Sequence, residues 1–115
     1  MHIETLKSHF KTHKERLLFG RYITTDRIKP ILENLPSVFK VCTIGKSVND
    51  ENIYSVSIGN GRKKVLIWSQ MHGNESTTTK ALFDFFNFLS TSNEFSDTIM
   101  TNCTLMIIPM LNPDG

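Results

Sequence analysis

Apolar residues recur at near-helical spacing in the first third of the chain, which predicts two helices there. The first is expected over residues 3–19, with Gly20 ending it. Its apolar positions are Ile3, Leu6, Phe10 and Leu17. A second, shorter helix is expected within residues 24–36, with Pro30 in its first turn, where a missing N–H matters least. Its buried side is expected to be Ile28, Ile31, Leu32 and Leu35.

The pattern changes to strand-like segments in the middle of the chain. Residues 38–46 and 52–59 are rich in β-branched residues and are separated by the polar stretch SVNDE, which predicts a β-hairpin. Two unbroken apolar runs then stand out, Val65–Trp68 and Cys103–Leu111. Runs without polar alternation are typical of strands covered on both faces, so both are expected to be interior strands.

Between the two apolar runs we expect one helix and one loop. The helix is predicted from about Glu75 to Ser90, with Asn74 as its cap, and the polar stretch 91–101 is predicted to be a loop. The expected inner face of the helix is Leu82, Phe85, Phe86 and Leu89, widened by Phe83 and Phe88. Together these elements predict an α/β fold in which flanking helices pack on a mixed β-sheet led by the hairpin.

Length and composition fit one globular domain. A chain of 115 residues suits a single domain over 1–115, with helices in 1–36 and the sheet in 38–115. The net charge of +2 is too small to indicate nucleic-acid binding, and no apolar run approaches the ~20 residues that span a bilayer. We therefore expect neither a nucleic-acid nor a membrane partner. The N-terminal charges also argue against a secretion signal.

The two cysteines bear on the compartment. Cys42 and Cys103 lie in apolar segments without CxxC spacing, so we favour buried free thiols over a disulfide. Free thiols favour a reducing, cytoplasmic location.

The candidate chemistry lies at the end of the first apolar run, in HGNE. His72 and Glu75 are three residues apart across an expected strand-to-helix turn, and imidazole nitrogen and carboxylate oxygen are both good zinc donors. The pair supplies two metal ligands, whereas a competent site needs a third. The alternative is a buried, hydrogen-bonded pair without a metal. His9 and His13, one helical turn apart, are interpreted as a solvated helix face.

The order strand, HGNE, helix, strand and NPDG over residues 63–115 resembles the N-terminal part of the zinc metallocarboxypeptidases of the carboxypeptidase A type. The resemblance implies a Zn²⁺ cofactor, a peptide or peptide-like substrate, and His72 and Glu75 as the first two zinc ligands. In that family the third ligand, a histidine, the substrate-binding arginines and the general-base glutamate follow well after NPDG. This chain has none of them, so we assign it no catalytic residue and give Asp114 no chemical step.

The resemblance therefore implies the first part of a larger catalytic domain, inactive alone, that would hydrolyse C-terminal peptide bonds by zinc-activated water. Two alternatives stay open. The aspartoacylase and succinylglutamate desuccinylase group also uses an HGNE-like pair, and a non-catalytic interaction module needs no metal. Strands that are interior in a whole domain would become edges in its first part, which predicts oligomerisation through exposed strand edges.

Overall fold

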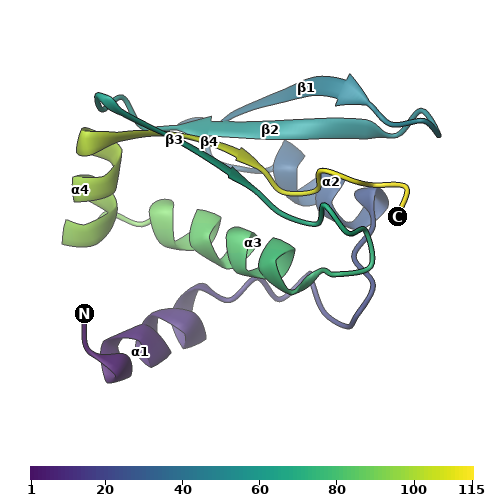
Figure 1. Cartoon of the computed structure of the whole chain (residues 1–115). Helices are drawn as coiled ribbons and strands as arrows, with labels where there is room; N and C mark the ends of the chain where they lie inside the picture. Colours follow the sequence, from purple (N-terminus) through teal and green to yellow (C-terminus); the bar gives the residue numbers. More distant parts are fainter.

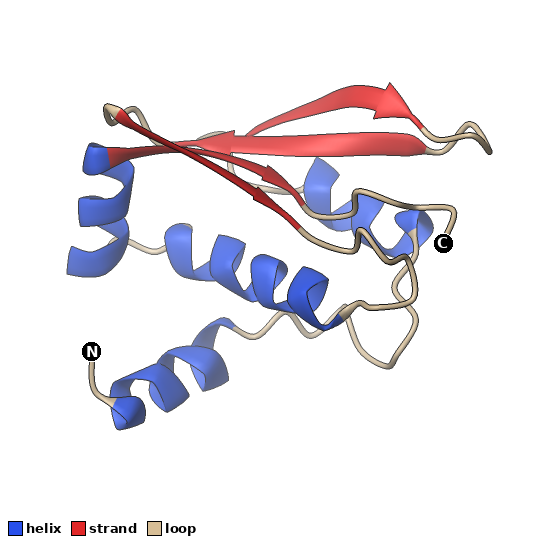
Figure 2. Cartoon of the chain, viewed as in Figure 1, coloured by secondary structure: helices blue, strands red, loops and turns tan.

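The computed structural model describes residues 1–115, which form four helices and one four-stranded sheet. The elements in chain order are α1 (Ile3–His13), α2 (Thr25–Glu33), β1 (Lys40–Lys46), β2 (Asn52–Ile58), β3 (Lys63–Trp68), α3 (Thr77–Leu89), α4 (Glu94–Asn102) and β4 (Cys103–Ile108). The predicted α/β class, the hairpin and the two later strands are all present (Figure 2).

The sheet is mixed and runs in the order β1-β2-β4-β3. β1 and β2 form the antiparallel hairpin, β2 and β4 are antiparallel, and β3 and β4 are parallel. β4 is therefore an interior strand, as predicted. β3 has β4 as its only neighbour and forms an edge of the sheet, which is the position expected of such a strand when the chain is the first part of a larger domain.

All four helices lie on the same side of the sheet, with α3 beneath β3 and β4 and α1 beneath α3 (Figure 1). The core lies between the sheet and the helices and includes Phe83 and Phe86 from α3, Ile28 from α2, Val56 from β2 and Ile107 from β4. The far face carries no covering layer. Leu66 and Trp68 are each about half exposed, so β3 is covered on one face only in this chain, and its other face is open as expected for the first part of a larger domain.

α1 is shorter than predicted and buries none of its residues. It ends at His13 because contacts with α3 replace the next helical hydrogen bonds. The Asn87 Nδ2 donates to the His13 carbonyl at 2.9 Å, and the Glu15 N–H donates to the Asp84 Oδ1 at 2.7 Å. The predicted inner residues of this segment are exposed, namely Ile3, Leu6, Phe10 and Leu17.

Three further expectations fail for local reasons. α2 begins at Thr25, which puts Pro30 in its second turn rather than its first. Because proline has no N–H, the Asp26 carbonyl lacks its helical donor. The predicted loop 91–101 contains most of α4, whose N-terminus is closed by a capping box between Asn93 and Ser96. Asn74 does not cap α3, because that helix starts two residues later than expected, at Thr77.

The cysteines are less buried than expected. Cys42 is exposed and Cys103 is half-buried, and both thiols are free. None of the helices is long and apolar enough to cross a bilayer.

Candidate metal centre

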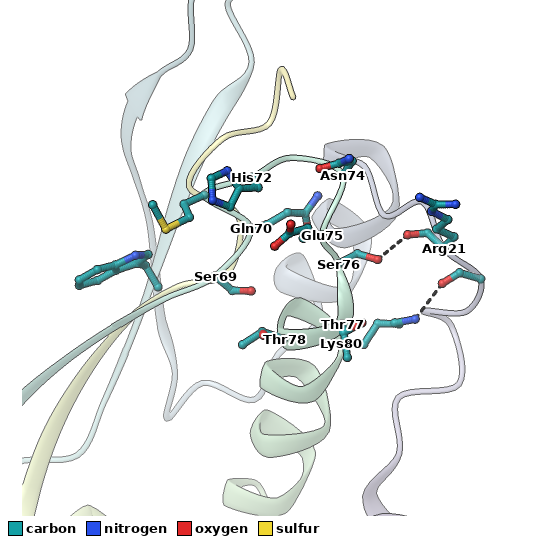
Figure 3. Close-up of a pocket in the computed structure, with 13 residues that line it drawn as sticks. Arg21, Ser69, Gln70, His72, Asn74, Glu75, Ser76, Thr77, Thr78 and Lys80 are labelled. Carbon is teal, nitrogen blue, oxygen red and sulfur yellow. Dashed lines mark hydrogen bonds between the residues drawn. The ribbon is translucent and has the colours of Figure 1, made fainter.

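HGNE forms a tight turn in the loop that joins β3 to α3. The Glu75 N–H donates to the His72 carbonyl at 2.9 Å, which closes the turn, and both side chains are exposed. Gly73 and Asn74 occupy the turn itself. In Figure 3 the His72 and Glu75 side chains project from this loop, beyond the end of β3 and above the start of α3. The sequence prediction that one strand-to-helix turn presents both groups matches this arrangement.

His72 and Glu75 line one open depression of about 900 Å³. Its wall is mostly polar and includes the N-terminal residues of α3 and two cationic side chains, Arg21 and Lys80. The depression has room for a ligand that reaches both members of the pair.

The loop is held from beneath by Gln70, a buried residue that is only 5% exposed. Its backbone adopts a φ of 50°, in the left-handed region that non-glycine residues rarely occupy. Its Nε2 donates to the Ile23 carbonyl at 2.9 Å and to the Gly73 carbonyl at 2.7 Å. Its Oε1 accepts from the Thr79 hydroxyl at 2.7 Å. Gln70 thus joins the metal-site turn to α3 and to the segment before α2.

The segment leading to NPDG supports the loop from the other side. Beyond β3 and β4, the Leu111 N–H donates to the Ser69 carbonyl and the Asn112 N–H to the Gln70 carbonyl, both at 3.0 Å. The Asp114 carboxylate accepts from the Ser47 Oγ at 2.6 Å and from the Asn49 N–H at 3.1 Å. Asp114 therefore ties this turn to the β1–β2 hairpin.

The backbone at Gly20 and Arg21 borders the depression and is hydrogen-bonded to the start of α3. The Ser76 hydroxyl donates to the Arg21 carbonyl, and the Lys80 Nζ donates to the Gly20 carbonyl at 2.8 Å (Figure 3). The hydroxyl run at the start of α3 includes Thr79, which is fully buried. The Ser76 and Thr79 hydroxyls thus make hydrogen bonds within the fold.

His9 and His13 form a separate cluster on the other side of α3. Their rings stack at 5.7 Å between centroids and both pack edge-on against Phe88. Burial, and then the nearby His9, lower the pKa of His13 below its usual 6.5. Nothing in the structure links these imidazoles to His72.

The donor set at the turn fits zinc as part of a coordination shell. An imidazole nitrogen and a carboxylate oxygen are both ordinary zinc ligands. No group of three or more histidine, cysteine, aspartate or glutamate side chains gathers anywhere in the structure. The turn therefore offers two donors for a metal.

The sequence of this chain matches the zinc carboxypeptidase family over residues 25–115. The chain belongs to the zinc carboxypeptidase family. The match includes the hairpin, the HGNE turn and the NPDG turn, so it extends further towards the N-terminus than residues 63–115, on which the resemblance was based.

Individual zinc carboxypeptidase relatives agree with this assignment. Gamma-D-glutamyl-L-diamino acid endopeptidase 1 of Lysinibacillus sphaericus is 32% identical over 94 residues, which cover 75% of this chain and 22% of that protein. Carboxypeptidase D of Mus musculus is 26% identical over 98 residues, which cover 76% of this chain and 7% of that protein. These matches do not favour the aspartoacylase group or a non-catalytic module.

The fold agrees as well. The crystal structure of a metallo-carboxypeptidase from Burkholderia cenocepacia superposes with a TM-score of 0.68 at 20% identity, covering 82% of this chain and 28% of that one. The chain thus spans well under half the length of the zinc carboxypeptidase relatives it matches.

Sequence reasoning pointed to His72 and Glu75 as candidate ligands, and it missed the residues that contact their turn. Gln70 carried no local signal, because a single polar residue after an apolar run is ordinary. Thr79 carried no signal either, because a threonine near the start of a helix is ordinary, and only the fold shows that it is fully buried. Arg21 lies far from HGNE in sequence, and Lys80 lies on the following helix. Only the fold brings both side chains to the depression.

Proposed function

We propose that His72 and Glu75 are two zinc ligands of a metallocarboxypeptidase site that is completed by residues outside this chain. The observation that carries the proposal is the closed turn between the Glu75 N–H and the His72 carbonyl, 2.9 Å apart, from which both side chains reach one depression. Family membership supports zinc as the metal. The proposed substrate is a peptide or a peptide-like molecule, hydrolysed at its C-terminal bond.

The role of this chain in the reaction is to bind and orient. Zinc, when bound, lowers the pKa of a coordinated water towards ~7 and polarises a carbonyl group. His72 and Glu75 supply donors on one short turn, and the network around Gln70 keeps that turn fixed to the sheet and to α3. No residue of this chain is proposed as the general base, because Glu75 is used as a ligand.

A chain with only two of the ligands should bind a divalent metal weakly and hydrolyse nothing. We expect titration of the 115-residue chain with Co²⁺, a spectroscopic substitute for Zn²⁺, to give weak binding that His72→Ala and Glu75→Gln each remove. The double variant His9→Ala/His13→Ala is the matched control, since it deletes two imidazoles outside the depression. Binding that survives His72→Ala but is lost in the control would overturn the assignment.

Activity separates a partial site from a complete one. We expect no hydrolysis of a blocked C-terminal dipeptide by the isolated chain with zinc present. A γ-D-glutamyl peptide is the second substrate to test, because the Lysinibacillus relative is named for that bond. Hydrolysis of either substrate, lost in Glu75→Gln, would show that the site needs no residues from outside this chain.

Self-association is proposed to follow from the open edge of the sheet. β3 pairs on one side only, and two of its own side chains on the uncovered face of the sheet, Leu66 and Trp68, are half exposed. A second copy of the chain can pair with this edge and cover part of that apolar face.

A cytoplasmic location is proposed on the state of the thiols. Cys42 lies on β1 and Cys103 on β4, with β2 between them, and both are free. Reducing compartments keep such thiols unpaired.

A further inference from the structure

We propose that the Gln70 side chain is the positioning residue of the HGNE turn, which it holds rigid in the metal-free protein. This inference rests on the proposed function, because it concerns how the same two ligands are presented. Gln70 is not itself proposed as a metal ligand. It lies beneath the turn, 5% exposed, and touches the turn through the Gly73 carbonyl.

The orientation of the Gln70 amide is fixed by its partners. Its nitrogen lies 2.9 Å from the Ile23 carbonyl and 2.7 Å from the Gly73 carbonyl, and carbonyl oxygens can only accept. Both amide hydrogens are therefore used. The amide oxygen then faces the Thr79 hydroxyl, which must donate to it. Since no buried polar side-chain atom lacks a partner anywhere in the molecule, the network is complete.

Three separate parts of the fold meet at this one side chain. Ile23 belongs to the segment before α2, Gly73 to the metal-site turn, and Thr79 to the first turn of α3. With its one hydrogen donated to Gln70, the Thr79 oxygen accepts from the Ser69 hydroxyl at 3.0 Å, which extends the link to the end of β3. A turn with exposed side chains is thereby fastened to the sheet and to α3.

The backbone of Gln70 supplies an independent argument. Its φ of 50° is unfavourable for a residue with a side chain, whereas glycine adopts it freely. Backbone geometry alone would therefore favour glycine at this position. The side chain of Gln70 opposes that preference through three hydrogen bonds, which points to a role that glycine could not perform.

The decisive comparison is Gln70→Gly against Gln70→Glu in the 115-residue chain. Glycine keeps the backbone conformation and removes the side-chain hydrogen bonds. Glutamate keeps the size but puts a carboxylate oxygen against two carbonyl oxygens. If the side chain holds the turn, both variants should loosen it. If backbone conformation holds it, glycine should leave it unchanged or tighter.

The readout is the ¹⁵N order parameter of the Gly73, Asn74 and Glu75 amides in the absence of metal. We expect values near about 0.85 in the wild type, falling below about 0.6 in both Gln70 variants, while amides of β2 and β4 stay rigid. Thr79→Val should lower the order parameters partway, and Thr79→Ser, which keeps the hydroxyl, should restore them. Unchanged order parameters at the turn in Gln70→Gly would overturn the inference, as would an equal loss throughout the sheet.

A Co²⁺ titration links the motion of the turn to the ligands. We expect Gln70→Glu and Gln70→Gly to weaken Co²⁺ binding about tenfold, the scale of one lost net hydrogen bond. If His72→Ala and Glu75→Gln bind Co²⁺ as tightly as the wild type does, the proposed metal site is wrong. The order parameters then still decide the role of Gln70. If Co²⁺ binding needs both ligands but ignores Gln70, the positioning role fails and the metal site stands.

Discussion

The backbones of Gly73 and Gly115 lie in direct contact. A Cβ atom added to Gly73 would lie 2.3 Å from the Gly115 Cα, closer than any real contact of a Cβ atom. The HGNE turn and the NPDG turn thus pack against each other with no room for a side chain between them. The two motifs that identify the family are parts of one local structure.

We expect Gly73→Ala to lower the free energy of unfolding by about 1–3 kcal/mol, the usual cost of overpacking. The added methyl group must push the NPDG turn or the HGNE turn out of place. Urea denaturation of the 115-residue chain measures the loss. Gly45→Ala is the matched control, because a Cβ atom there meets nothing within 4 Å. Equal stability of Gly73→Ala and Gly45→Ala would contradict the contact.

Removal of the α4 cap should have a similar effect for a different reason. The Asn93 Oδ1 accepts from the Phe95 N–H at 3.1 Å and from the Ser96 N–H at 3.0 Å, so it satisfies two free donors at the helix start. We expect Asn93→Ala to cost about 0.5–2 kcal/mol of stability, measured by thermal or urea unfolding. Asn93→Asp, which keeps an accepting oxygen, should lose much less. A loss as large in Asn93→Asp would argue against capping.

Asp84 should make the stability depend on pH. Burial, partly offset by the Glu15 N–H and by Lys14, raises the pKa of Asp84 above its usual 3.8. Between 3.8 and that raised pKa the folded chain holds more protons than the unfolded chain, so the contribution of this group to stability falls as the pH rises. Above the raised pKa this unfavourable contribution is constant.

We expect Asp84→Asn to flatten the pH dependence of stability in this acidic window while keeping an oxygen for the Glu15 N–H. Urea midpoints measured from pH 3 to pH 7, about the range in which carboxyl groups titrate, test this. Asp26→Asn, which deletes a carboxylate at the start of α2, controls for loss of one charge. A slope in Asp84→Asn as steep as in the wild type would refute the shifted pKa.

Self-association should depend on the uncovered edge of the sheet. We expect the apparent mass of the wild type in sedimentation experiments to rise with concentration, and Leu66→Lys to reduce that rise, since a charge on an edge strand blocks pairing. Val48→Lys is the control, because Val48 is 99% exposed at the hairpin tip, away from β3. A wild type that stays monomeric at every concentration, or an equal effect of Val48→Lys, would contradict the proposal.

The apolar pattern predicted the strands and α3 well but not their surroundings. The run Val65–Trp68 forms β3 as expected, yet whether a strand is covered on one face or two depends on elements elsewhere in the fold. The end of α1 was not predictable either, because Asp84 and Asn87 on α3 take the hydrogen-bonding groups that would have continued the helix. α4 was missed because its sequence is mostly polar and has only a weak apolar stripe.

The site divides in the same way. His72 and Glu75 were recognisable as candidate ligands because their chemistry and their spacing are both local; their role in binding zinc stays a prediction. The residues that hold them were not, because the partners of Gln70 lie at Ile23, Gly73 and Thr79, which only the folded chain brings together. Local sequence thus indicates candidate metal donors, whereas only the fold brings together the hydrogen bonds around their turn.

The most direct test of the central claim is anomalous diffraction at the zinc edge from crystals of the chain soaked in Zn²⁺. We predict a peak about 2.0–2.2 Å from both an imidazole nitrogen of His72 and a carboxylate oxygen of Glu75, absent in Glu75→Gln. A peak on His9 and His13 alone, or a wild-type site that contacts only one of the two proposed ligands, would contradict the account.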